Sequence, residues 1–180
     1  MVVSLIGMSG AGKSVIGSRL YEKTKLICPN TVFIDGDMVR PIIGPDLEYT
    51  LDDRRKSETR RSKLCKFLSD QDIHVICAAL SNYPEWRRWC RENIEYYFEI
   101  YLKVPITILH NRDNKNLYKK AINGEIENVV GFDIDFQPPK FADLTIENTG
   151  QKSVEEIVDI IVTSLSVIDS EKKGKYVFNL

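Results

Sequence analysis

An octapeptide near the start of the chain has the residue types and spacing of a phosphate-binding loop. Residues 7–14, GMSGAGKS, match the pattern GxxxxGK[ST] at every fixed position. The glycines let the backbone curl so that N–H groups point at phosphate oxygens, and a following helix presents its positive end to the same anion. Lys13 supplies a charge for the β- and γ-phosphates, and the Ser14 hydroxyl can bind Mg²⁺. The predicted ATP-binding residues of this loop are Gly7, Ser9, Gly10, Ala11, Gly12, Lys13 and Ser14.

Two carboxylates follow the next predicted strand. Asp35 and Asp37, in the sequence FIDGD, come directly after a run of β-forming residues. Ligands of open parallel sheets bind beyond the carboxyl ends of the strands, so both carboxylates are expected beside the phosphate loop. We predict that Asp37 accepts the proton of an attacking hydroxyl, and that Asp35 joins Ser14 as a Mg²⁺ ligand. Asp37, Lys13 and Asp35 are thus the candidate catalytic residues; the alternative is an ordinary Asp-Gly-Asp turn.

Arginines are frequent in the segment after this turn. A run of charges on a helix is most often a solvated face, and some of these arginines are expected to be no more than that. Arg40 and Arg54, however, flank the acidic turn and a predicted loop. A guanidinium group binds phosphate or sulfate through two parallel hydrogen bonds. We therefore predict that Arg40 and Arg54 bind an anionic acceptor.

Strands and helices alternate along the chain and must position these residues. Strands are predicted at 2–6, 31–35, 73–80, 97–102 and 144–146, and helices at 14–23, 52–69, 84–94 and 153–167. This alternation predicts an α/β fold of the P-loop NTPase type, with a parallel sheet flanked by helices. The polar, weakly structured segment 111–140 is predicted to be a functional lid, with a passive connection as the alternative. The length of 180 residues predicts a single domain over 1–180.

The composition excludes several classes of protein. Hydrophobic residues make up 43% and charged residues 28%, which argues against disordered and fibrous chains. The net charge of -1 argues against binding to nucleic acid or to a membrane surface through bulk charge. No stretch approaches the roughly 20 apolar residues of a membrane span. The 4 cysteines lack CxxC spacing, which favours reduced thiols in a cytoplasmic protein.

Together these segments resemble the adenylyl-sulfate (APS) kinase family, whose members phosphorylate the 3′-hydroxyl of adenosine 5′-phosphosulfate. The resemblance covers nearly the whole chain. It rests on GMSGAGKS, DGDMVR (35–40), DLEYTLDDR (46–54), AALSNY (78–83) and RDNKNLYKKAINGEIENVVG (112–131). The last segment resembles the lid of the family and is the most specific, because general P-loop kinases do not carry it.

The resemblance implies roles for individual residues. Lys13 and Ser14 would bind ATP and Mg²⁺, Asp37 would orient the 3′-hydroxyl, and Arg112 would lie against the adenine of ATP. Lys115 would reach into the site from the lid. The habit of the family also implies a possible homodimer. The implied acceptor-binding residues are Asp37, Arg40, Tyr49, Arg54, Ser57, Leu80, Ser81, Lys115 and Val129.

The departures from the family pattern gather around the acceptor base. Met38 replaces the Asn that follows DGD in the family, and Glu48-Tyr49 replace its Gly-Phe before the next helix. Ser57 falls where the family has Asn after the Asp-Arg pair, and Asn82 replaces the Pro of its Ser-Pro-Tyr. The Gly-Phe of the family's lid becomes Asn128-Val129. Losing one aromatic ring from a base sandwich removes stacking worth about 1–3 kcal/mol. The residues that handle ATP phosphates are unchanged.

Two acceptors therefore stay open. The chain could phosphorylate adenosine 5′-phosphosulfate, with Tyr49 stacking on the base and Phe132 replacing the lost ring. It could instead act on another nucleotide, such as cytidine diphosphoramidate, whose smaller pyrimidine suits a less aromatic pocket. A third hypothesis is a non-catalytic nucleotide-binding regulator. The presence of Lys13, Ser14, Asp35 and Asp37 argues against that hypothesis.

Overall fold

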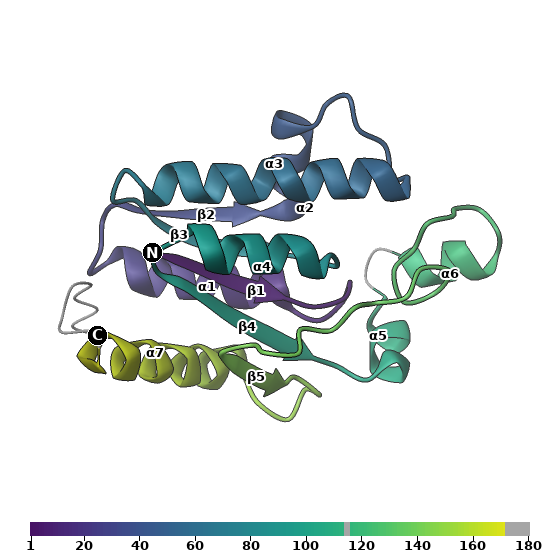
Figure 1. The fold of residues 1–180 in the computed structure, drawn as a ribbon. Helices are drawn as coiled ribbons and strands as arrows, with labels where there is room; N and C mark the ends of the chain where they lie inside the picture. Colours follow the sequence, from purple (N-terminus) through teal and green to yellow (C-terminus); the bar gives the residue numbers. More distant parts are fainter. Residues whose placement is uncertain (114–115, 172–180) are drawn as a thin grey trace.

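A parallel β-sheet forms the centre of the molecule. The computed structural model describes residues 1–113 and 116–171, the last five of these by backbone alone (Figure 1). Neighbouring strands are parallel throughout, in the order β2-β3-β1-β4-β5. This arrangement confirms the predicted α/β fold. The strands are β1 (Val2–Ile6), β2 (Thr31–Asp35), β3 (His74–Ala79), β4 (Tyr97–Lys103) and β5 (Leu144–Glu147).

Helices cover both faces of the sheet. α1 and α7 pack on one face, and α3 and α4 pack on the other. α5 and α6 lie beyond the carboxyl ends of the strands, where Figure 1 shows them next to the end of β4 and the loop after β1. The helices of the described residues are α1 (Lys13–Lys25), α2 (Gly36–Ile43), α3 (Leu51–Ser69), α4 (Pro84–Asn93), α5 (Ile106–Arg112), α6 (Leu117–Ile122) and α7 (Val154–Glu171).

The central strands bury both of their faces. In β1, Val3 and Leu5 belong to the core under α1 and α7, and Val2 belongs to the core under α3 and α4. Successive side chains of a strand point to opposite faces, so a strand covered on both sides is mostly apolar, and Ser4 is the exception in β1. Full burial of one such side chain stabilises the fold by about 1.5–3 kcal/mol. β1 therefore gives the loop that follows it a rigid base.

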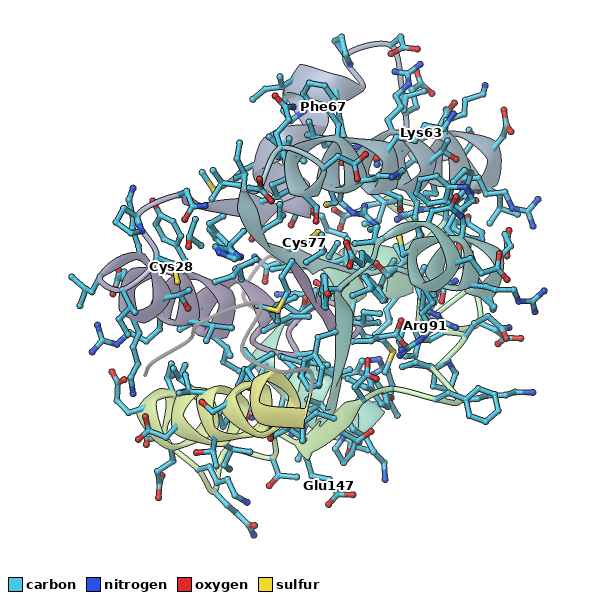
Figure 2. All side chains as sticks on the ribbon, turned by 60° about the vertical axis from the view of Figure 1, so that its left-hand side comes forward. Cys28, Lys63, Phe67, Cys77, Arg91 and Glu147 are labelled. Carbon is cyan, nitrogen blue, oxygen red and sulfur yellow. The ribbon has the colours of Figure 1, made fainter. Side chains whose placement is uncertain are left out.

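The outer side of α3 faces solvent, whereas its inner side is unusually polar. Lys63 and Phe67 project outward from this helix, and Cys77 of β3 lies in the interior (Figure 2). Phe67 is 61% exposed. The buried residues of α3 are instead Ser57, Glu58, Arg61, Ser62 and Cys65.

Three helices were not predicted from the sequence. α2 begins at Gly36, within the segment that we interpreted as a turn, because the Asp35 side chain accepts hydrogen bonds from the first-turn amides of this helix. α5 lies mostly before the predicted lid, and α6 lies within its first part. The lid segment is thus less irregular than expected. α7, which was predicted, begins with a capping box: the Glu156 amide donates to Ser153 Oγ at 3.2 Å, and Ser153 N donates to Glu156 Oε2 at 2.7 Å.

Candidate active site

The loop between β1 and α1 has the backbone that its sequence predicts. Gly10 and Gly12 adopt positive φ values of 80° and 89°, a region that other residues rarely enter. Gly12 is the N-cap of α1 and supplies no side-chain acceptor to its first turn. The amides of that turn, together with the positive end of the helix, suit a phosphate group. Lys13 Nζ donates to the Met8 carbonyl at 2.8 Å, so its charge lies over the loop.

Residues beyond β4 and β5 support this loop from one side. The buried Asn148 side chain donates through Nδ2 to the Ala11 carbonyl at 3.0 Å. Arg112, at the end of α5, has Nη1 3.5 Å from the Gly10 carbonyl. A Cβ on Gly150 would lie 3.4 Å from Arg112 Nη2, so this loop and Arg112 are neighbours. The structure therefore places Arg112 beside the phosphate loop and adds Asn148, which the sequence analysis did not select.

The two predicted carboxylates take different positions. Asp35 is 7% exposed, and its Oδ1 accepts from Asp37 N at 2.9 Å and Met38 N at 3.4 Å. This oxygen therefore has a structural task in starting α2, in addition to any role toward Mg²⁺. Asp37 lies in the first turn of α2 and is exposed. Of the two, Asp37 is the carboxylate that a substrate can reach.

Arg40 and Arg54 lie against the same aromatic ring. The guanidinium carbons of Arg40 and Arg54 are 4.4 and 5.3 Å from the centroid of the Tyr49 ring. Arg54 Nε donates to the Tyr49 carbonyl at 3.1 Å, and Arg40 donates to the Glu48 carbonyl. Burial lowers the pKa of Arg54, and the positive charge of Arg40 lowers it further. An anion placed here would relieve this repulsion, so the pair fits the predicted anionic acceptor.

Leu80 and Ser81 follow β3, which lies between β2, the strand before the arginine pair, and β1, the strand before the phosphate loop. Ser81 is buried and has a φ of 48°, which is uncommon for a residue with a side chain. Its Oγ lies 3.2 Å from the donor Arg61 Nη2, and its carbonyl accepts from Arg87 Nη1 at 2.9 Å. Ser57 is buried on the inner side of α3. Ser57 and the Ser81 hydroxyl thus lie in the interior of the structure, and their binding to an acceptor stays a prediction.

The start of the lid is attached to the phosphate loop. Asp113 accepts hydrogen bonds from Tyr118 N at 3.2 Å and Lys119 N at 2.9 Å, which holds the first turn of α6. The buried Tyr118 points its hydroxyl at the Ser9 carbonyl, 3.4 Å away. Burial raises the pKa of Tyr118 to about 12, so the hydroxyl keeps its proton and remains a donor. The predicted Lys115 lies outside the described residues.

The middle of the lid lies beside the arginine pair. Arg54 Nη2 donates to the Asn128 carbonyl at 2.5 Å. The next residue, Val129, is 2% exposed and belongs to the main core. Val129 was expected to form part of the wall around the acceptor base, but its side chain offers almost no surface to a ligand. Phe132, at 50% exposure, is the large apolar side chain that this loop presents.

The order of the strands places the site residues along one edge of the sheet. The acidic turn and the arginine pair follow β2, Ser81 follows β3, and the phosphate loop follows β1. Arg112 and Asn148 follow β4 and β5. Carboxyl ends of parallel strands share an edge, and adjacent strands are about 4.8 Å apart. The edge therefore carries an anion site, a phosphate site and an arginine side chain, in that order.

A glycine-rich loop before a helix, a nearby pair of arginines and a segment that contacts both suit a phosphoryl-transfer enzyme. The profile of the family described as adenylylsulphate kinase matches residues 1–147. The chain belongs to this family. It is accordingly an ATP-dependent phosphotransferase with a nucleotide-binding P-loop.

The chain is similar to relatives that are named for different substrates. It is 40% identical over 166 residues to cytidine diphosphoramidate kinase of Campylobacter jejuni, covering 92% of this chain and 96% of that protein. It is 33% identical over 174 residues to adenylyl-sulfate kinase of Halothermothrix orenii, covering 97% and 91%. Among solved structures, APS kinase of Mycobacterium tuberculosis in complex with AMPPNP and APS gives a TM-score of 0.82 at 30% identity, covering 92% and 96%.

Other features of this APS kinase family member were not evident from its sequence. Burial raises the pKa of Glu58 to about 7, although the positive charges of Arg61 and Arg87 oppose this effect. Arg61 Nη2 lies 4.0 Å from Glu58 Oε1. In the sequence these residues look like solvated helix charges, and no local pattern distinguishes them. None of the helices in residues 1–113 and 116–171 is long and apolar enough to span a membrane.

Proposed function

We propose that this kinase transfers the γ-phosphoryl group of ATP to the ribose 3′-hydroxyl of a nucleotide that carries an anionic group on its 5′ side. The observation that carries the proposal is the arginine pair around Tyr49. Its two guanidinium groups lie 4.4 and 5.3 Å from one ring centroid, at the same sheet edge as the phosphate loop. Two neighbouring guanidinium groups suit a phosphate or sulfate group.

ATP would lie on the β1, β4 and β5 side of this edge. The amides of residues 9–14 and the Lys13 ammonium would bind its phosphates, and Arg112 would lie against its adenine. Mg²⁺ would neutralise charge on the phosphates; Ser14, and Asp35 through the oxygen that does not cap α2, are the proposed protein ligands. Glycine is required at position 12 of this loop, because a Cβ there would lie only 2.8 Å from the Asn148 side chain that supports the loop.

The proposed reaction is a single in-line displacement. The acceptor oxygen forms a bond to the γ-phosphorus while the bond to the β–γ bridging oxygen breaks, and ADP leaves. The hydroxyl proton passes to the Asp37 carboxylate, which is exposed at the start of α2. Arg40 and Arg54 hold the acceptor, and the lid excludes water, which would otherwise compete for the phosphoryl group.

Among possible acceptors, we favour cytidine 5′-diphosphoramidate. The chain is 40% identical to a kinase named for that substrate and 33% identical to the adenylyl-sulfate kinase compared above. The burial of Val129 also leaves the base wall without the second aromatic ring that the family pattern predicts at this position. Adenosine 5′-phosphosulfate is the second candidate, supported by the exposed rings of Tyr49 and Phe132.

A direct test is ADP release with ATP and Mg²⁺ and each acceptor in turn. We expect turnover with the cytidine compound to exceed that with adenosine 5′-phosphosulfate, and ³¹P NMR to place the new phosphate on the 3′-oxygen. A 3′-deoxy analogue of the preferred acceptor is the matched control and should give only background hydrolysis. Tight ATP binding without turnover of any nucleotide would refute the proposal and support a non-catalytic regulator.

A further inference from the structure

The Asn82 side chain joins two segments that are far apart in the sequence. It is 5% exposed, and both of its polar atoms have backbone partners on the return path of the lid. Nδ2 donates to the Asp135 carbonyl at 3.1 Å, and Oδ1 accepts from Gln137 N at 2.8 Å. Asn82 therefore substitutes for a neighbouring strand at this point of the lid.

Arg87, one turn into α4, reinforces the same junction. Its Nη1 donates to the Gln137 carbonyl at 2.7 Å and to the Ser81 carbonyl at 2.9 Å. Further along α4, Arg91 Nη2 donates to the Phe141 carbonyl at 2.7 Å. Three side chains from the β3–α4 region thus bind backbone groups between residues 135 and 141.

The lid therefore has two separate attachments. Tyr118 fixes its beginning against the phosphate loop, and Asp113 holds the helical turn that carries Tyr118. Asn82 and Arg87 fix its return path against the loop after β3. Between these attachments lies Asn128, whose carbonyl accepts from Arg54 of the anion site. In Figure 1 the chain runs from α6 back toward β5, so the second attachment sets where this return path begins.

We propose that Asn82 is a positioning residue: it clamps residues 135–137 so that the lid loop at 128–132 is held over the acceptor side of the site. The kinetic part of this proposal rests on the proposed function; the clamp itself does not. Because both partners are backbone groups, substitutions at Asp135 or Gln137 should be tolerated far better than substitution of Asn82. Replacing the amide removes both hydrogen bonds from this partly buried junction, which costs free energy and loosens the segment.

Asn82→Ala tests the clamp directly through hydrogen exchange measured by mass spectrometry. The Gln137 amide donates one of the two hydrogen bonds to Asn82. Pro138 and Pro139 after it carry no amide hydrogen, so in a peptide that ends at Pro139 the last exchangeable amide is that of Gln137. We expect exchange of the Gln137 amide to be about tenfold faster. Asn93→Ala is the matched control, because Asn93 Nδ2 donates to the Trp89 carbonyl at 2.8 Å within α4 and does not contact the lid.

The kinetic measurement separates positioning from a general loss of structure. We expect Asn82→Ala to raise KM for the nucleotide acceptor by about tenfold and to leave KM for ATP nearly unchanged, because the phosphate loop has its own attachment to the lid. Asn82→Asp keeps the acceptor for Gln137 N but loses the donor to the Asp135 carbonyl. In this variant the Gln137 amide should stay protected while KM for the acceptor rises.

Each result has a defined meaning. Unchanged exchange at Gln137 in Asn82→Ala overturns the clamp. Faster exchange with an unchanged acceptor KM overturns the positioning role. If Asn82→Ala does not fold, the Asp variant decides, and an unprotected Gln137 amide in a folded Asp variant refutes the clamp. If the wild-type protein phosphorylates no nucleotide, the proposed function fails, while the exchange result still decides the clamp.

Discussion

Lys13 shows how a single side chain connects the phosphate loop to its ligand. Its Nζ donates to the Met8 carbonyl, so the ammonium group already lies over the loop before it binds a phosphate. We predict that Lys13→Ala lowers kcat by about 10²- to 10³-fold, because a preorganised charge is lost where negative charge develops. ADP release at saturating ATP measures the effect. Lys25→Ala, at the exposed far end of α1, should behave like the wild type; near-normal turnover of Lys13→Ala would contradict the role.

Arg54 and Arg55 form a natural pair for testing the anion site. Arg54 packs against Tyr49 and donates to the lid, whereas Arg55 is exposed and its Nε is 3.7 Å from Glu85 Oε1 at the surface. We predict that Arg54→Gln raises KM for the acceptor by about 10- to 100-fold, the loss expected for a charge-assisted bond, with little change in KM for ATP. Arg55→Gln should change neither constant by more than about twofold. Equal effects of the two substitutions would mean that Arg54 acts only through overall charge.

The sequence was informative wherever a residue's neighbours in the chain are also its partners in the site. Residues 7–14 form one loop, and Asp35 and Asp37 are two residues apart, so spacing alone places them. Asn148 could not be found in this way, because its partner Ala11 lies 137 residues earlier in the chain. Ser57 and Val129 were placed by resemblance to a family pattern, which gives a position but not the direction of the side chain.

At the scale of elements, the lid loop after α6 exposes the Phe132 ring and buries the Val129 side chain. Since Val129 is 2% exposed in the core, Val129→Phe should mainly overpack that core and cost about 1–3 kcal/mol of stability. The informative substitution is therefore Phe132→Ala. If the Phe132 ring stacks on the acceptor base, its loss should raise acceptor KM by about 5- to 100-fold. Phe141→Ala, at an 83% exposed position on the return path, is the control and should leave both KM values unchanged. An unchanged acceptor KM in Phe132→Ala would remove this ring from the base site.

The elements that the sequence did not predict share a physical cause. α2 has Gly and Asp at its start and Pro41 in its interior, which are turn residues by their intrinsic preferences. The Asp35 cap and the packing of α2 on β2, β3 and α3 override those preferences. α6 has only 6 residues and depends on Asp113 and on the burial of Tyr118. Short helices of this kind are stabilised by tertiary contacts, which are not visible in local sequence.

At the scale of the whole molecule, the strand order brings segments that are distant in the sequence together at one edge of the sheet. Because β3 lies between β2 and β1, the acceptor-side residues and the phosphate loop are neighbours at one edge without sharing a strand. The α/β fold was predictable, since alternating strands and helices leave few alternatives. The polar inner face of α3 was not, because Glu58 and Arg61 have the sequence pattern of surface charges.

That inner face should make stability depend on pH. Burial raises the pKa of Glu58 from the ordinary 4.5 to about 7, so in this interval the folded state binds more protons than the unfolded chain. Unfolding free energy must therefore fall as pH rises from about 4.5 to about 7, and the loss is complete above the folded pKa. One pKa unit corresponds to about 1.4 kcal/mol, which sets an upper limit of about 3 kcal/mol for this group.

Glu58→Gln removes the titrating group while keeping its shape. We predict a smaller fall in unfolding free energy between about pH 5 and about pH 8 for this variant than for the wild type, measured by urea denaturation at each pH. Glu92→Gln, at an exposed position of α4, should keep the wild-type dependence. Glu99 is also buried with a raised pKa, so a residual slope of the same sign is expected in Glu58→Gln. Identical slopes in Glu58→Gln and the wild type would show that Glu58 is ionised throughout this range, held so by Arg61 and Arg87.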